Sequence, residues 1–138
     1  MHHVHHHLNP WAIVVSAVIL WILGAAWYSP VLFAKPWMAA LGITPDPTNK
    51  KGLLPGMIAS LVGDLILALV LDHLIIWANA GSVHGGAFIG FLVWFGFFAA
   101  PNFPQCIYER RPLRLFAINN GYWLVGLIIV GVLMAVWQ

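Results

Sequence analysis

The sequence predicts an all-α protein, a polytopic four-helix transmembrane bundle with a short interfacial helix after the first span. Of its 138 residues, 62% are hydrophobic and only 7% are charged, whereas soluble domains carry about 25% charged residues. Four apolar stretches are each long enough to cross a hydrocarbon core about 30 Å thick. We therefore expect residues 1–138 to form a single transmembrane domain surrounded by bilayer lipid, without a separate soluble domain.

The N-terminal arm, residues 1–9, is rich in histidine. Two interpretations are open. Imidazole groups bind Zn, Cu and Ni, so the arm is a candidate metal ligand. Alternatively it is a solvated tail or the remnant of an expression tag. The histidines concerned are His2, His3, His5, His6 and His7.

The first span is predicted over residues 11–28, which contain no charged residue. Asn9-Pro10 is a suitable helix start, because proline is tolerated in a first turn. The residues before the span include no lysine or arginine, which argues against a cleaved signal peptide. In the following segment, apolar residues surround Lys35, a pattern typical of a short helix lying in the membrane interface.

The second span, residues 53–79, carries Asp64 near its middle and Asp72 nearer its end. An acidic side chain at mid-membrane costs about 2.5–3.5 kcal/mol, so Asp64 should face protein or water. Residues four apart lie along one ridge of a helix, and here the ridge is small or polar. We expect the other helices to pack on this ridge, which comprises Gly56, Ser60, Asp64, Ala68 and Asp72.

The third span is predicted over residues 83–100 and the fourth over residues 115–137. Pro101 and Pro104 are expected to end the third span. A G-x-x-x-G pair in this span allows close helix approach. The glycines predicted to support helix packing are Gly56, Gly63, Gly86 and Gly90.

The basic residues predict the orientation in the membrane. Lys35, Lys50 and Lys51 lie between spans one and two, and three arginines lie between spans three and four. The positive-inside rule places both segments in the cytoplasm and both termini outside, in a bacterial inner membrane. No extended basic surface suits nucleic acid. The residues expected to anchor the inner interface are Trp27, Tyr28, Lys35, Trp37, Arg111 and Arg114.

Two stretches carry a family resemblance. The first is Trp27-Tyr28-Ser29-Pro30, followed by Phe33, Lys35 and Trp37. The second runs from Arg111 to Phe116 and leads into Asn119, Gly121 and Tyr122. Together they resemble a family of small bacterial four-span membrane proteins, catalogued as domain of unknown function seventeen-sixty-one, over about residues 9–137. The resemblance implies four helices in a bacterial inner membrane, and it supplies no activity.

All seven histidines fall on the predicted outer side. With Asp72, they form a candidate site for a divalent transition metal such as Zn, Cu or Ni. Their spacing matches no known metal motif, and His73 and His84 could equally cap helix ends or lie among lipid headgroups. A tetrapyrrole with His73 or His84 as its axial ligand is a further cofactor hypothesis.

A second candidate site is the intramembrane polar group of Ser60, Asp64 and Asp72. An acid within the membrane is by default a functional hypothesis, here a proton or cation site. The alternative is a protonated Asp64 hydrogen-bonded to a neighbour, since no basic residue lies at that depth. The neighbours considered are Ser16, Ser60, Trp21 and Trp94.

The sequence contains no G-x-S-x-G, H-E-x-x-H or phosphate-loop motif, so we do not expect an enzyme. The leading hypothesis is an accessory or scaffold subunit that acts through helix packing, with copies of itself or with other membrane subunits as partners. The alternative is a small transporter or metal-handling protein that uses Asp64, Asp72 and the outer histidines.

Overall fold

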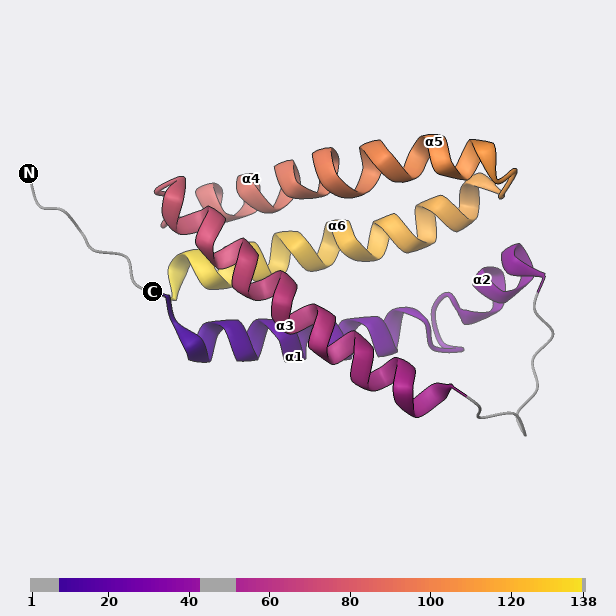
Figure 1. Cartoon of the computed structure of the whole chain (residues 1–138), viewed down its shortest axis with the longest axis horizontal. Coiled ribbons are helices and arrows are strands. Elements are labelled where there is room, and N and C mark those ends of the chain that lie inside the picture. The colour runs from indigo at the N-terminus through magenta and orange to yellow at the C-terminus, as the bar shows by residue number, and fades with distance from the viewer. Residues whose placement is uncertain (1–7, 43–51, 138) are drawn as a thin grey trace, which may run out of the picture.

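A computed structural model describes residues 8–42 and 52–137, and this part of the chain is helical without any β-strand (Figure 1). Four helical segments are long and apolar enough to cross a membrane, which confirms the predicted all-α fold class. The protein is a multi-pass membrane protein. Its elements are α1 (Pro10–Trp27), α2 (Ala34–Leu41), α3 (Leu53–Trp77), α4 (Val83–Val93), the π-helical turn η1 (Trp94–Ala99), α5 (Ala100–Tyr108) and α6 (Leu113–Val136).

The first helix begins where Asn9-Pro10 predicts. The Asn9 side-chain oxygen accepts hydrogen bonds from the backbone N–H groups of Trp11 and Ala12, at 3.1 and 3.3 Å. These two groups would otherwise lack partners in a helix N-terminus. The Asn9 amide also donates to the Trp137 carbonyl at 3.1 Å. The start of α1 and the end of α6 therefore lie together at one end of the bundle (Figure 1).

The prediction that Pro101 and Pro104 end the third span was wrong. The chain stays helical from Val83 to Tyr108, because α4, η1 and α5 follow one another without a break. In η1 the Ala100 N–H donates to the Phe95 carbonyl, five residues back. This wide π turn precedes Pro101, which has no N–H to donate and whose ring crowds a regular α turn. The helix therefore absorbs the proline instead of stopping at it.

The tightest packing joins α4 to α6 through glycines. A Cβ added at Gly86 would lie 2.6 Å from the Ala135 Cβ, and one added at Gly90 would collide with the Leu127 backbone. From the other side, a Cβ at Gly131 would lie 2.6 Å from the Gly86 carbonyl oxygen. Gly86 and Gly90 thus lie at a close helix contact, as the G-x-x-x-G pair predicts, and Gly131 completes it from α6.

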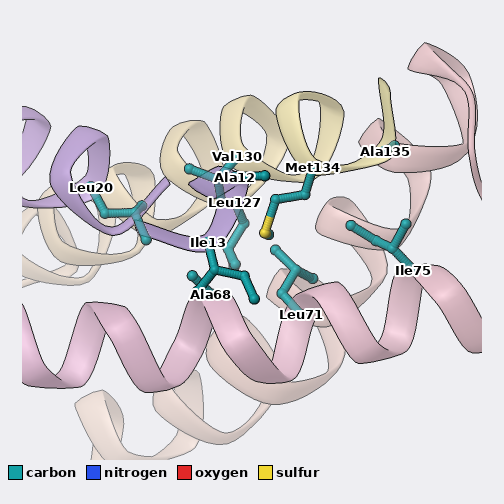
Figure 2. Close-up of a cluster of buried hydrophobic side chains, with 10 residues drawn as sticks. All are labelled: Ala12, Ile13, Leu20, Ala68, Leu71, Ile75, Leu127, Val130, Met134 and Ala135. Atoms are coloured by element: carbon teal, nitrogen blue, oxygen red, sulfur yellow. The ribbon is translucent and has the colours of Figure 1, made fainter. Parts of the chain in front are cut away.

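The central helix is α6 and not the second span, which corrects the prediction that the other helices pack mainly on α3. Ten residues of α6 are buried, against five of α3. The helices α1, α3 and α4 all contact α6. The apolar core lies between α1, α3 and α6 (Figure 2), and consists of Ala12, Ile13, Leu20, Ala68, Leu71, Ile75, Leu127, Val130, Met134 and Ala135.

The predicted ridge on α3 is divided into two parts. Asp64, Ala68 and Asp72 are buried, whereas Gly56 and Ser60 are exposed. The reason is that α3 lies diagonally across α1 (Figure 1), so its first turns leave the bundle. No atom lies within 4 Å of a Cβ added at Gly56 or Gly63. Within the described residues, these two glycines make no close helix contact, so their predicted role in helix packing stays a prediction.

Candidate functional site

The two sequence stretches that carry the family resemblance meet in space. The Trp27 indole Nε1–H donates to the Ile118 carbonyl at 2.9 Å, and the Tyr28 hydroxyl donates to Asn119 Oδ1 at 2.7 Å. The Tyr122 hydroxyl donates back to the Leu20 carbonyl of α1 at 2.7 Å. Three hydrogen bonds therefore fix the end of α1 against the first half of α6.

A second connection runs from the π turn to α6 through Asn120. The Trp94 Nε1–H donates to the Asn120 carbonyl at 2.7 Å, and the Asn102 amide donates to Asn120 Oδ1 at 3.2 Å. Asn120 is buried, so these bonds satisfy polar groups that could not reach water. Residues 118–120 of α6 thereby position both α1 and the η1–α5 segment.

A cavity of 790 Å³ lies beside these connections, and Asp64 forms part of its wall. Its lining comes from α1, α2, α3, η1 and α6. Six of the described lining residues are aromatic, and Asp64 is the one acid among those that the structure describes. The described lining residues are Trp21, Gly24, Ala25, Tyr28, Trp37, Gly52, Leu53, Gly56, Met57, Ser60, Gly63, Asp64, Leu67, Phe98, Tyr122 and Trp123.

The Asp64 side chain is only 4% exposed, yet no ion pair or hydrogen bond joins it to another described residue. Two of the partners proposed from the sequence donate elsewhere. Trp21 Nε1–H donates to the Met57 carbonyl at 3.2 Å, and Trp94 donates to Asn120. The Ser16 hydroxyl is buried without a partner among the described residues. Among the described residues, Asp64 therefore has a cavity beside it but no partner that neutralises it.

Asp72 does not belong to the same site, although it shares the ridge. It is 1% exposed, lies outside the lining of the cavity, and faces the Asn9 backbone N–H and the His73 side chain. Its Oδ2 atom has no partner among the described residues. Of the predicted polar group, the structure brings Asp64 and Ser60 together in one wall and separates Asp72 from them.

The predicted metal ligands fall into two groups. The five histidines of the arm lie outside the described residues. Within residues 8–42 and 52–137, no three His, Cys, Asp or Glu side chains come close enough to hold a metal ion. His73 Nδ1 donates to the Leu69 carbonyl at 2.7 Å, and its ring contacts Trp77. His84 is exposed. A metal site that uses the arm stays a prediction.

A pocket of 530 Å³, called the polar pocket here, lies between α2, α5 and α6 at the end of the bundle that holds α2 and the α5–α6 turn, which we call the loop end. The two charged residues of this pocket form an ion pair, with Arg111 Nε 2.8 Å from Glu109 Oε2. The Gln105 amide also donates a hydrogen bond to Glu109 Oε1 at 3.0 Å. The Gln105 hydrogen bond, and then Arg111, hold the pKa of Glu109 below its ordinary value. Both charges are exposed at this end, as expected at a membrane surface.

Tyr28 and Trp37 line both the polar pocket and the Asp64 cavity. Their rings meet edge to face with centroids 5.4 Å apart. These two residues, predicted as interfacial anchors, therefore form the wall that the two pockets share. Lys35 and Arg114, predicted as anchors too, are exposed at the same end of the bundle.

Several residues of the site were not found by sequence reasoning. Tyr122, Trp123 and Phe98 complete the aromatic wall, and Asn102 supports Asn120. For Tyr122 a signal existed, since it stands in the second of the stretches that carry the resemblance. For Phe98 and Trp123 there was none, because aromatic residues that face lipid and aromatic residues that face a cavity look alike in a sequence.

Comparison with known proteins supports the resemblance. A family model described as "Protein of unknown function (DUF1761)" matches residues 11–135. This match covers both resembling stretches and all four spans almost completely. No curated protein and no solved structure matches the chain. The function must therefore be inferred from the geometry of the chain itself.

Proposed function

The chain belongs to the family described as protein of unknown function (DUF1761), and we propose a role for it from its own cavity. In this proposal the protein is a small membrane carrier that binds a cationic solute at Asp64. The observation that carries this proposal is a carboxyl group, 4% exposed, that lines a 790 Å³ space and has no partner within residues 8–42 and 52–137. A buried charge needs a counter-charge, and a bound cation supplies it. The proposed role is non-enzymatic.

The proposal is tested by reconstituting the protein into liposomes and measuring uptake of protons, Na⁺, Zn²⁺ and tetraphenylphosphonium. Asp64→Asn should abolish uptake, because it removes the charge with little change of shape. Asp72→Asn is the matched control, since it makes the same change on the same helix outside the cavity. Uptake by the Asp64→Asn protein equal to that of the wild type, for every cation transported, would contradict the proposal.

The second candidate function is the accessory or scaffold subunit. The observation that favours it is the first part of α3, where Gly56, Ser60 and Gly63 form an exposed strip of small residues that no other described helix covers. Small residues allow close approach of another helix in a membrane. A cysteine at Ser60, in a background where Cys106 is serine, should then form disulfide-linked dimers in membranes. Monomers alone, under oxidation and in native mass spectrometry, would count against this function.

We also propose that the loop end faces the cytoplasm of a bacterial inner membrane, with both chain ends outside. Lys35, Arg110, Arg111 and Arg114 support this orientation, because they gather at the end that holds α2 and the α5–α6 turn. Short basic loops remain on the cytoplasmic side. A reporter that works only in the cytoplasm should be inactive when fused after Trp137, and activity there would reverse the orientation.

A further inference from the structure

We propose that the solute held at Asp64 is an organic cation with an apolar body, such as a substituted ammonium or phosphonium ion. This inference rests on the proposed function and names the chemical class of the ligand. It follows from the kinds of group that line the cavity, from those that are missing there, and from the size of the space.

The charges in the wall select for a cation. Asp64 carries the only carboxyl group among the described lining residues, and none of those residues is Lys, Arg or His. Along this described part of the wall, an anion would therefore meet a repulsive group and no attractive one. A cation would meet one carboxylate in surroundings that screen it far less than water does.

The polar groups in the wall are too few for a metal ion. Mg²⁺ and Ca²⁺ take six or more oxygen ligands. Beside Asp64, the described wall offers side-chain oxygens only from Ser60, Tyr28 and Tyr122. The hydroxyl groups of both tyrosines already donate hydrogen bonds, to Asn119 and to the Leu20 carbonyl. Transition metals prefer imidazole or thiolate, and the described lining contains neither.

The aromatic side chains supply what the polar groups do not. The aromatic residues of the lining come from α1, the residue that follows it, α2, η1 and α6: Trp21, Tyr28, Trp37, Phe98, Tyr122 and Trp123. The Trp21 N–H is directed to the Met57 carbonyl, so its ring remains as the surface available to a ligand. Ring faces attract organic cations by cation–π interaction and cover apolar groups at the same time.

The volume suits a molecule and not an ion. A space of 790 Å³ lies within the range of about 300–1,000 Å³ typical of small-molecule sites. The shared wall of Tyr28 and Trp37 places this space next to the polar pocket at the loop end. A ligand with a charged centre could therefore approach the cavity from this neighbouring polar pocket as well as from the side that faces lipid.

Binding of two isosteric ions of opposite charge tests the inference. Purified full-length protein in nanodiscs of zwitterionic lipid is titrated with tetraphenylphosphonium and, separately, with tetraphenylborate. Tetraphenylphosphonium should bind saturably, and tetraphenylborate should not. Asp64→Asn should weaken cation binding by about tenfold or more, whereas Asp64→Glu should largely restore it and Asp72→Asn should leave it unchanged. If Asp64→Asn fails to fold, the comparison of the two ions on the wild type still decides.

The outcomes separate this inference from the proposed function. Saturable binding of both ions, or of neither, overturns the inference. If the uptake of protons, Na⁺ or Zn²⁺ into liposomes still depends on Asp64, the proposed function stands and only the ligand class is wrong. If no cation depends on Asp64, both fall together.

Discussion

The hydroxyl of Tyr28 donates to Asn119 Oδ1 at 2.7 Å, and this bond ties the last turn of α1 to the first turns of α6. The same tyrosine ring meets Trp37 edge to face and forms part of the wall between the two pockets. One side chain thus connects the packing of the bundle with the boundary of the Asp64 cavity. Removing this hydrogen bond therefore tests the packing of the bundle and the boundary of the cavity together.

Tyr28→Phe removes the hydroxyl and leaves the ring. We expect a loss of about 1 kcal/mol in the free energy of unfolding, since Asn119 then loses its donor. Unfolding in mixed detergent micelles, followed by tryptophan fluorescence, measures this loss. Tyr108→Phe is the control, because Tyr108 is 86% exposed and its change should be neutral. Equal stabilities for the two variants would show that the Tyr28 hydrogen bond does not stabilise the bundle.

The glycines of α4 and α3 should differ sharply in their tolerance of a methyl group. Gly90→Ala places a Cβ against the Leu127 backbone, so it should destabilise the protein by about 1–3 kcal/mol through overpacking. Gly63→Ala meets open space, and alanine is the better helix former, so its effect should stay within about 1 kcal/mol. The two unfolding free energies are compared in the same micelles. A destabilising Gly63→Ala would instead indicate a helix contact on α3, as the scaffold function requires.

The pH response of the loop end should follow Glu109. Its pKa is lowered in the folded protein by Gln105 and Arg111, so this carboxylate adds stability above its unfolded pKa and loses it as the pH falls through the folded value. Carboxyl ¹³C shifts of Glu109 should titrate below the ordinary value of 4.5. Gln105→Ala and Arg111→Gln should each raise the midpoint. A midpoint insensitive to both changes would exclude this hydrogen-bonded pair in solution.

The spans could be predicted from composition, but the partners of each helix could not. In a soluble protein one helix face is apolar, and it reveals where the core lies. In a membrane both lipid and protein neighbours are apolar, so α6 looks no different from α3 although it holds twice as many buried residues. Ala68 and Ile66 illustrate this, since one is fully buried and the other is 58% exposed on the same helix.

Sequence predictions were more accurate where a side chain forms a defined hydrogen bond with nearby backbone. Asn9-Pro10 predicts the start of α1 correctly, because the asparagine side chain has a defined task there. Pro101 misled because its effect depends on the preceding π turn, which has no sequence signature. Asp64 was recognised as a candidate from its depth alone. Its cavity was not foreseen, since that depends on how Phe98, Tyr122 and Trp123 come together from two helical segments.

The central claim is that Asp64 is a ligand-binding carboxyl group in a cavity and Asp72 is not. Dicyclohexylcarbodiimide, an apolar reagent that modifies carboxyl groups within membranes, tests this in the unaltered protein, with the labelled residue identified by mass spectrometry. We predict that Asp64 is labelled, that Asp72 is not, and that tetraphenylphosphonium slows the labelling. Labelling of Asp72 in preference to Asp64, or an Asp64 that the reagent cannot reach, would contradict the claim.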